Sequence, residues 1–400
     1  MKAVILAAGE GSRMRPLTYS RPKVMLPIAN KPILEHLLVE MRQAGITDFI
    51  FVVGYRDEQV RGYFDTGEKW GVNIVYTNQR KQLGTADAIR MVESLVDGNF
   101  LVVNGDIIVN HKDIKKLAHK NGNSMGIIEV ADTSGLGVVE LSDGKVVHIY
   151  EKTEKPPSRT ANAGLYLLTP AIFEAISLTP KSPRGEYEIT DSLMLIMDEG
   201  SDISYHKISY WLNLSYPWDL LATNESLMAG IESQNLGEIE ENVVIKGAVS
   251  IGKNTVVRSG AYITGPVIIG QSCEIGPNCY IRPFTAIADS CHIGNAVEVK
   301  NCIIMEGSKF PHHNYVGDSI IGEGCNFGAG TKVANLRLDK KEIWIADVNT
   351  RRRKLGAIIG DEVETGINVS INVGCLIGNN THIGPGAVAS GDILPNSRIF

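Results

Sequence analysis

Hydrophobic residues in the second part of the chain recur at every sixth position. Ten consecutive positions of this spacing, from Ile251 to Met305, hold an aliphatic side chain or methionine. The spacing resumes at Ile321 and, after a second interruption, at Ile359. A period of six is typical of a hexapeptide β-helix, in which each face of a coil turns one such side chain inward. The pattern predicts a left-handed parallel β-helix of hexapeptide repeats over residues 241–400.

The first part of the chain alternates between strand-like and helix-like patterns. The elements are expected at 2–8 (strand), 33–41 (helix), 49–53 (strand), 85–96 (helix) and 100–103 (strand). Such alternation predicts a Rossmann-like α/β domain, in which helices cover a parallel sheet. We place this domain at 1–229 and a linker at 230–240.

Two polar features follow strands of the predicted sheet. The loop Gly9–Arg15 follows the first strand, and Asp106 follows the strand at 100–103. Ligands of parallel sheets bind at the carboxyl ends of the strands, and glycines let backbone N–H groups approach a phosphate closely. The loop lacks the third glycine of the dinucleotide fingerprint, because position 14 is Met, and no G-K-[ST] follows it. An ordinary turn between a strand and a helix remains an alternative.

Composition and charge exclude several classes of protein. The chain of 400 residues is 44% hydrophobic, which is typical of a globular protein, and its apolar runs are too short for a membrane span or a secretory signal. Its 45 acidic and 39 basic residues give a net charge of −6, which argues against a nucleic-acid binder. Six cysteines without a C-x-x-C motif argue against a zinc site. We expect a soluble, cytoplasmic protein that acts on small molecules.

Four segments of the first domain carry a family resemblance. LAAGEGSRMRP, RPKVMLPIANKPI, QLGTADAI and VVNGDI occur in this order and resemble the nucleotidyltransferases that make nucleotide-sugars from sugar-1-phosphates. The implied nucleotide-binding residues are Leu6, Ala7, Ala8, Gly9, Gln79, Gly84 and Thr85, with Arg13 and Lys23 on the triphosphate. The implied sugar-phosphate residues are Gly137, Glu151, Lys152 and Asn162, and the implied Mg²⁺ ligands are Asp106 and Asn213.

The chemistry of this family fits these residue types. A sugar phosphate oxygen attacks the α-phosphorus of a nucleoside triphosphate, and pyrophosphate leaves. Because the nucleophile is already ionised, catalysis needs positioning and charge neutralisation rather than a general base. The pair Glu151-Lys152 resembles the thymidylyltransferase branch more than the bacterial N-acetylglucosamine-1-phosphate branch. UTP and dTTP, and glucose and N-acetylglucosamine, therefore stay open as substrates.

The six-residue spacing fails at GSKFPHHNYVGDS, where a loop that leaves the solenoid is a candidate for function. With the following NFGAGT, this region resembles the acetyltransferase half of bifunctional enzymes that acetylate glucosamine-1-phosphate and then uridylylate the product. The resemblance implies that His312 accepts a proton from the sugar amine as it attacks acetyl-CoA. The implied substrate-binding residues are Arg282, Lys300 and Lys341 for the sugar phosphate and Tyr315, Asn326 and Asn335 for the amino sugar.

The basic run Arg351–Lys354 lies in a segment longer than the bacterial pattern and similar to archaeal-type bifunctional enzymes. It is a solvated loop or a contact for the phosphates of coenzyme A. The resemblance also implies a homotrimer built through the β-helix. The leading hypothesis is a bifunctional enzyme that uses acetyl-CoA and UTP. The alternatives are a hexose-1-phosphate nucleotidyltransferase with a purely structural β-helix, and a regulatory subunit without catalysis.

Overall fold

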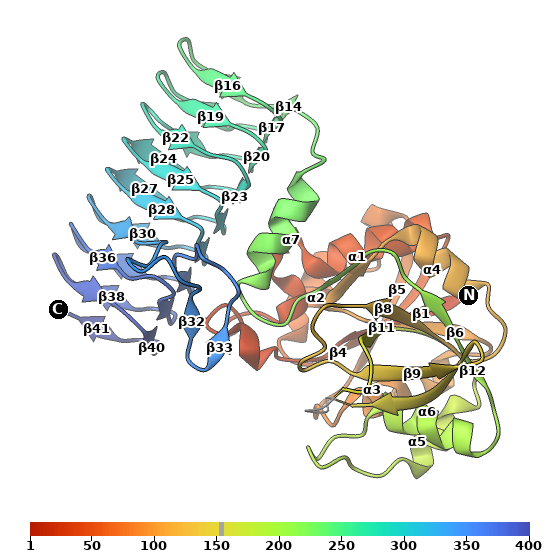
Figure 1. The fold of residues 1–400 in the computed structure, drawn as a ribbon. Helices are drawn as coiled ribbons and strands as arrows, with labels where there is room; N and C mark the ends of the chain where they lie inside the picture. The colour runs from red at the N-terminus through yellow and green to blue at the C-terminus, as the bar shows by residue number, and fades with distance from the viewer. Residues whose placement is uncertain (152–155) are drawn as a thin grey trace. The chain divides into compact units, whose positions relative to one another are not determined.

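The chain divides into two compact units, which are drawn in Figure 1. The structure is a computed structural model that describes residues 1–151 and 156–400. The first unit comprises Met1–Glu10, Arg21–Met25 and Ile33–Asn213. The second unit comprises Gly11–Ser20, Leu26–Pro32 and Leu214–Phe400. The domain boundaries expected at 229 and 240 stay a prediction.

The described residues of the first unit form a nine-stranded mixed sheet. Its strands, in spatial order, are β5 (Asn73–Asn78), β4 (Asp48–Val53), β1 (Lys2–Ala7), β6 (Phe100–Asn104), β11 (Thr160–Leu168), β8 (Ser124–Glu129), β12 (Ile203–Lys207), β10 (Lys145–Tyr150) and β9 (Val138–Ser142). The expected parallel pairing holds for β5, β4, β1 and β6, whereas β11 runs antiparallel to both of its neighbours. The expectation of a parallel sheet therefore holds for its first four strands and for the neighbouring pair β8 and β12, which also runs parallel.

Helices pack on both faces of this sheet. They are α1 (Ile33–Gln43), α2 (Asp57–Phe64), α3 (Thr85–Arg90), α4 (His111–Ala118), α5 (Ile172–Leu178) and α6 (Ile189–Asp198), with 3₁₀ turns η2 (Lys23–Met25), η3 (Glu68–Trp70) and η4 (Glu93–Leu95). One hydrophobic core contains side chains of α1, α2 and α4, and a separate core contains those of α3, α5 and α6. The helix expected at 85–96 stops at Arg90, because the next backbone bonds span three residues and tighten the chain into η4.

The second unit contains the predicted β-helix, whose described strands lie in three parallel sheets (Figure 1). The first sheet contains β14 (Gln234–Asn235), β17 (Val249–Ile251), β20 (Val267–Ile269), β23 (Thr285–Ile287), β26 (Ile303–Ile304), β29 (Ile320–Ile321), β34 (Ile358–Ile359), β37 (Leu376–Ile377) and β40 (Asp392–Ile393). The second contains β15 (Glu238–Ile239), β18 (Val256–Val257), β21 (Glu274–Ile275), β24 (His292–Asn295), β27 (Lys309–His312), β30 (Asn326–Phe327), β35 (Glu364–Thr365), β38 (His382–Ile383) and β41 (Arg398–Ile399). The third contains β16 (Val244–Lys246), β19 (Tyr262–Thr264), β22 (Tyr280–Ile281), β25 (Glu298–Lys300), β28 (Tyr315–Gly317), β31 (Lys332–Val333), β36 (Ser370–Ile371) and β39 (Val388–Ala389).

The register of these sheets corrects one position of the hexad pattern. Ile251 pairs with Ile269, 18 positions further on, but Ile287 pairs with Ile304, only 17 positions further on. Met305, which the spacing placed in the ladder, is buried but lies outside the solenoid core, whereas Ile304 belongs to it. The fold prediction itself is confirmed, because a coil can lose one corner residue without moving its three inward side chains.

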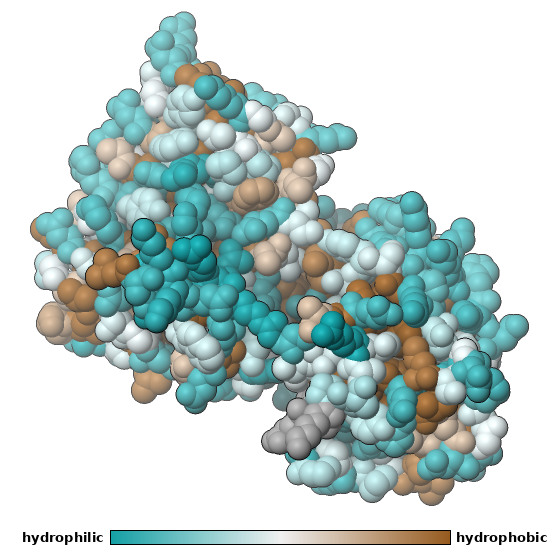
Figure 2. All heavy atoms as spheres, in the orientation of Figure 1, coloured by the Kyte–Doolittle hydropathy of each residue, from teal (hydrophilic) through white to brown (hydrophobic). Residues whose placement is uncertain are grey.

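A long segment leaves the solenoid between β31 and β34. Ile321 pairs with Ile359, 38 positions further on, so about one coil length of extra chain lies between consecutive coils. This excursion, residues 334–356, carries the hairpin of β32 (Trp344–Ile345) and β33 (Val348–Asn349). It contains the basic run Arg351–Lys354, and Figure 2 shows hydrophilic side chains gathered over this part of the β-helix.

The remaining elements of the described chain are short. They are η1 (Ser12–Met14), the hairpin of β2 (Pro27–Ile28) and β3 (Lys31–Pro32), the two-stranded antiparallel sheet of β7 (Ile107–Val109) and β13 (Trp211–Asn213), and α7 (Asp219–Met228). By its contacts, α7 belongs to the second unit. Among the described residues, no helix combines the length and the apolar character needed to cross a membrane.

Candidate functional site

The turn after β6 brings together the expected triphosphate and metal residues of the first unit. Nζ of Lys23 in η2 lies 2.6 Å from Oδ2 of Asp106, and the side chains are 12% and 34% exposed. Asn213 pairs with Ile107 in the two-stranded antiparallel sheet of β7 and β13, which puts it beside the residue that follows Asp106. A lysine, a carboxylate and an amide thus meet at the carboxyl end of the sheet, where a polyphosphate and its cation need them.

The expected nucleoside segment lies at the end of β1. Ala7 and Ala8 are buried, and Leu6 O accepts a hydrogen bond of 2.9 Å from Gly105 N–H, which ties the ends of β1 and β6 together. Ala8 O accepts a hydrogen bond of 2.9 Å from Nε2 of Gln82. Gln82 was not among the predicted residues, although it begins the segment QLGTADAI.

Gln79, Gly84 and Thr85 line the start of α3, and each makes a contact within the protein. The amide Nε2 of Gln79 donates to Gly84 O at 3.0 Å and to Oδ2 of Asp87 at 2.9 Å. Gly84 has a φ of +111°, and a Cβ there would lie 2.6 Å from the backbone N of Tyr187. Thr85 Oγ1 accepts the backbone N–H of Ile189 at 2.9 Å, where α6 begins. The backbone geometry therefore requires a glycine at position 84.

The sugar residues implied by the resemblance lie close together, since Gly137 precedes β9, Glu151 follows β10 and Asn162 lies in β11. A Cβ at Gly137 would lie 3.3 Å from Oε2 of Glu151 and 3.5 Å from Cβ of Asn162. Oε2 of Glu151 also accepts a hydrogen bond of 3.3 Å from Thr190, and its Oε1 lies 3.5 Å from Arg184. Lys152, also expected here, lies outside the described residues. Arg184 and Thr190 were missed, because they follow Glu151 by more than 30 residues.

The second unit contains the other expected triphosphate residue, Arg13. Arg13 lies in η1, and η1 begins directly after Gly11, which has a φ of +75°. Its guanidinium lies over the ring of Tyr216 at 5.7 Å from the centroid. The glycine at position 11 thus permits the left-handed backbone that starts this turn.

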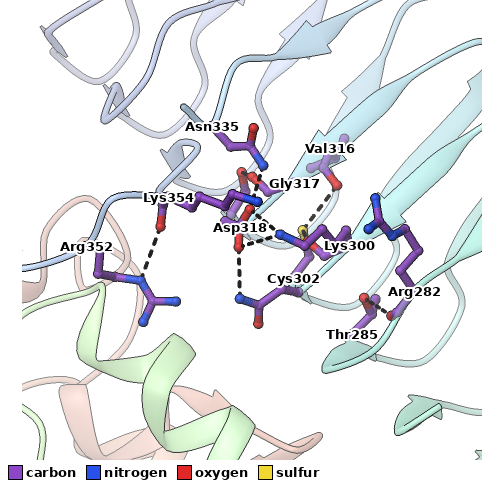
Figure 3. A network of polar contacts seen from close by, with 12 residues as sticks. Arg282, Thr285, Lys300, Cys302, Val316, Gly317, Asp318, Asn335, Arg352 and Lys354 are labelled. Atoms are coloured by element: carbon purple, nitrogen blue, oxygen red, sulfur yellow. Dashed lines mark hydrogen bonds and ion pairs between the residues drawn. The ribbon is translucent and has the colours of Figure 1, made fainter. Parts of the chain in front are cut away.

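A second cluster lies at one corner of the β-helix, and Figure 3 shows it from close by. The ammonium of Lys300 lies 3.0 Å from Oδ2 of Asp318, and Nδ2 of Asn335 donates to the same oxygen at 2.5 Å. Asn335 Nδ2 also donates to the hydroxyl of Tyr315 at 3.1 Å, and burial raises the pKa of this phenol. Three of the expected acetyltransferase residues, Lys300, Tyr315 and Asn335, are therefore neighbours.

Arg282 lies one coil before this cluster. Its N–H donates to Val299 O at 2.9 Å, so it stacks beside Lys300 in the same sheet. Its guanidinium Nη1 donates to Oε1 of Glu298 at 2.8 Å. The two basic residues expected to bind the sugar phosphate thus share a corner, and each has a carboxylate partner.

His312 and Asn326 lie elsewhere in the coil. His312 ends β27 and is exposed, with no hydrogen bond to its ring among the described residues. The expectation that it lies in a loop leaving the solenoid is wrong, because β27 and β28 continue the coil and pair with the strands on either side. Strand β28 separates it from Asp318, so His312 and Lys300 lie at opposite ends of one face of the solenoid. Asn326 is exposed on β30.

The excursion places the remaining basic residues. Lys341 is exposed on it, after a turn in which Asp339 pairs with Arg337. Lys354 forms a bridge with Leu336, and Leu355 N–H donates to Asn335 O at 3.1 Å, which brings Lys354 to the edge of the cluster in Figure 3. Lys354 was predicted only as part of the basic run Arg351–Lys354, a solvated loop or a contact for coenzyme A phosphates, and Asp318 was not predicted. Neither has a signal in the sequence, since Lys354 lies nearly 20 residues after Asn335.

Comparison with known proteins identifies both halves of the chain. Residues 2–229 match the nucleotidyl transferase family model, and residues 263–373 match the GMPPB C-terminal domain model. A bifunctional protein GlmU of Methanococcus maripaludis is 44% identical over all of this chain and 97% of the relative. A bifunctional sugar-1-phosphate nucleotidylyltransferase/acetyltransferase of Sulfurisphaera tokodaii is 40% identical over 98% of both chains.

Among solved structures, a UDP-glucose pyrophosphorylase complexed with UDP-glucose is similar to this chain at a TM-score of 0.52 and 27% identity. The match covers 57% of this chain and 99% of that structure. The full-length relatives match both halves of the chain, whereas the solved UDP-glucose pyrophosphorylase matches little more than one half. The chain therefore belongs to the family of bifunctional sugar-1-phosphate nucleotidyltransferase/acetyltransferases that includes the GlmU proteins.

Proposed function

We propose that the chain catalyses two consecutive steps toward UDP-N-acetylglucosamine. The β-helix transfers an acetyl group from acetyl-CoA to glucosamine-1-phosphate, and the N-terminal domain joins the product to UTP with release of pyrophosphate. The observation that carries the proposal is the pairing of Lys300, Tyr315 and Asn335 around one corner of the β-helix. A β-helix that serves only as a scaffold has no need for a buried charged network at a coil corner.

The residues of the first unit support nucleotidyl transfer with Mg²⁺. Asp106 and Asn213 offer oxygen donors, which Mg²⁺ prefers, and the described residues hold no cluster of three or more His, Cys, Asp or Glu that would favour another metal. Nucleotidyltransferases of this type generally use Mg²⁺, which neutralises charge on the transferring phosphate. Lys23 holds the triphosphate, and Gly137, Glu151 and Asn162 hold the sugar. We also assign Lys152 and Arg13 to the sugar phosphate and the triphosphate.

In the acetyltransferase step, an exposed imidazole is suited to accept the proton that the sugar amine loses. His312 is such a group, but it lies at the far end of β28 from Lys300 and Asp318. Within a single chain, the proposed base therefore lies apart from the residues proposed to bind the sugar phosphate. We infer that the chain forms a homotrimer, in which His312 of one copy faces Lys300, Tyr315 and Asn335 of the next. Arg282, Asn326, Lys341 and Lys354 complete this site.

Coenzyme A release tests the proposal directly. The protein is incubated with acetyl-CoA and glucosamine-1-phosphate, and free thiol is titrated. We expect thiol release that depends on the amino sugar. In a second assay, pyrophosphate release is measured with UTP or dTTP and with N-acetylglucosamine-1-phosphate or glucose-1-phosphate, and we expect the pair of UTP and N-acetylglucosamine-1-phosphate to react fastest. Pyrophosphate release without any thiol release would contradict the acetyltransferase assignment.

A further inference from the structure

The corner cluster of the β-helix is organised around the carboxylate of Asp318, a residue that the family resemblance did not indicate. The side chain of Asp318 is only 3% exposed, whereas that of Lys300 is 20% exposed. Oδ1 of Asp318 accepts hydrogen bonds from Lys300 at 3.2 Å and from Asn301 at 3.0 Å. Its Oδ2 accepts from Lys300 at 3.0 Å and from Asn335 at 2.5 Å. A carboxylate buried to this extent and bonded on both oxygens binds no ligand itself, but it fixes its donors.

The donors of Asp318 come from separate parts of the chain. Lys300 ends β25, Asn301 is the corner residue that follows it, and Asn335 begins the excursion. The backbone of Asp318 joins the same segments, because its N–H donates to Lys300 O at 2.8 Å and its carbonyl accepts from Gly356 N–H at 2.8 Å. One residue thus holds a coil end and both ends of the excursion in register.

The hydrogen bonds to Asp318 decide which atoms its neighbours present to a ligand. Both amide hydrogens of Asn335 point inward, to Asp318 and to the hydroxyl of Tyr315. The carbonyl oxygen of Asn335 therefore faces away from Asp318, as Figure 3 shows. Two of the three N–H groups of Lys300 meet the two carboxylate oxygens, which leaves one for a ligand. The cluster offers a cationic donor for a phosphate and a neutral acceptor for an amine or hydroxyl.

We propose that Asp318 is a positioning residue of the acetyltransferase site, which fixes Lys300 as a phosphate donor and the Asn335 carbonyl as an acceptor for the amino sugar. This inference rests on the proposed acetyl transfer and deepens it. A second tether supports the arrangement, because Asn301 also donates to Oε1 of Glu225 in α7 at 2.9 Å. Arg352 of the excursion donates to the same oxygen at 2.9 Å. The amide of Asn301 is thus held on both sides, as the positioning of Lys300 requires.

The variant Asp318→Asn tests this role with little change to the backbone. Asp318 has a φ of +52°, a left-handed conformation that Asn adopts readily. The new side chain has one oxygen and one NH₂ where three donors converge, so Asn335 loses the acceptor that holds its amide inward. We expect the KM for glucosamine-1-phosphate to rise about 10-fold, which is the scale of one charge-assisted hydrogen bond. The KM for acetyl-CoA should stay within about twofold, since Asp318 acts only on the sugar side.

The matched control is Asp289→Asn. Asp289 is another corner carboxylate of the solenoid and accepts a backbone N–H from Gln271 at 2.7 Å, but no hydrogen bond or ion pair joins it to a lysine or arginine in the described chain. We expect both KM values to be unchanged in this variant. Calorimetric titration with glucosamine-1-phosphate alone should give the same contrast in Kd, which separates binding from turnover.

A double-mutant cycle separates positioning from a general loss of structure. Because Asp318 fixes both Asn335 and Lys300, the effect of Asp318→Asn on the KM for glucosamine-1-phosphate should be smaller, but not zero, in an Asn335→Ala background. Equal increases in both KM values, or the same increase in both backgrounds, would overturn the inference. So would an unchanged KM. If Asp318→Asn does not fold, Asn335→Asp replaces it, because two carboxylates would then face each other and the same selective rise in KM is expected.

The wild-type assay keeps the two proposals distinguishable. If the wild-type protein releases no thiol with glucosamine-1-phosphate, the proposed acetyl transfer itself fails. If the wild-type protein is active and Asp318→Asn has unchanged KM values, only the positioning role fails.

Discussion

Lys23 and Asp106 form an ion pair, with Nζ of the lysine 2.6 Å from Oδ2 of the carboxylate. The cation proposed to hold the triphosphate and the carboxylate proposed to hold the metal are therefore each other's partners. Binding of a metal–nucleotide complex must exchange this pair for two new ones, Asp106 with the cation and Lys23 with the phosphate. The pair keeps both side chains in place without leaving either charge uncompensated.

Replacing Lys23 with Gln should slow nucleotidyl transfer selectively. We expect the barrier to rise by about 2–4 kcal/mol, on the scale of other lost charge-stabilising donors. Pyrophosphate release measures this step, and amino-sugar-dependent thiol release should be unchanged. Lys2→Gln is the control, because Lys2 of the same unit pairs with Asp97 and donates to Leu95 O at 2.8 Å, and neither partner belongs to the proposed site. Loss of both activities in Lys23→Gln would instead indicate a structural role.

Gly84→Ala should destabilise the first unit. The glycine has a φ of +111°, and an added Cβ would lie 2.6 Å from the backbone N of Tyr187, which cannot yield as a flexible side chain could. We expect a loss of at least about 2 kcal/mol, from the strained backbone and the clash together. Urea unfolding measures this loss. Gly98→Ala is the control, since no atom lies within 4 Å of its added Cβ, and a stable Gly84→Ala protein would contradict the geometry.

His312→Ala should abolish acetyl transfer and leave pyrophosphate release intact. The imidazole is exposed and has no partner among the described residues, so its removal should not disturb the coil. The adjacent His313 has a φ of +55°, which Asn tolerates, and His313→Asn is therefore the matched control. Residual amino-sugar-dependent thiol release close to the wild-type rate in His312→Ala would show that another group accepts the proton.

Acid should weaken the first unit through Asp113, which lies at the start of α4. Burial alone would raise the pKa of this carboxyl, but hydrogen bonds from Ser209, His206 and Asn110 lower it to about 2. Because the folded-state pKa is depressed, the stabilisation is fully present above the ordinary value of 3.8 and is lost as the pH falls toward 2.

Asp113→Asn measures this contribution. At pH 7 the variant should be less stable to urea by about 2 kcal/mol, and the difference from the wild type should shrink between pH 4 and pH 2. A difference that does not change over this range would mean that the carboxylate charge contributes nothing. The comparison uses unfolding midpoints of the full-length chains at matched ionic strength.

The sequence predicts the repetitive parts of the fold well, because equivalent positions there bury equivalent side chains. The ladder from Ile251 onward follows from the inward position of one aliphatic side chain per face, and α1 follows from apolar residues at helical spacing. The spacing cannot detect a coil shortened by one residue at its corner. It therefore assigns Met305 to the core in place of Ile304, and it places His312 in a loop.

The residues of the candidate site can be predicted from the sequence only where they lie together in a short segment. Lys23, Asp106 and Gly84 lie in short segments that carry a recognisable pattern. Asp318 has no such pattern, because its role comes from three donors that approach it in space. Lys354 pairs with Leu336, the neighbour of Asn335, only because the excursion closes on itself, which no local pattern reveals.

The way the excursion closes has a consequence for how this family can diversify. Its two ends are joined at a narrow neck, where Leu355 N–H donates to Asn335 O at 3.1 Å, and the coils before and after it pair as if nothing intervened. The entropic cost of a loop grows only slowly with its length, so residues beyond the neck can be lengthened, shortened or exchanged at little cost to the solenoid. The excursion can therefore change in length and sequence while the stacked coils stay the same. New ligand preferences can arise in the excursion without a change in the core.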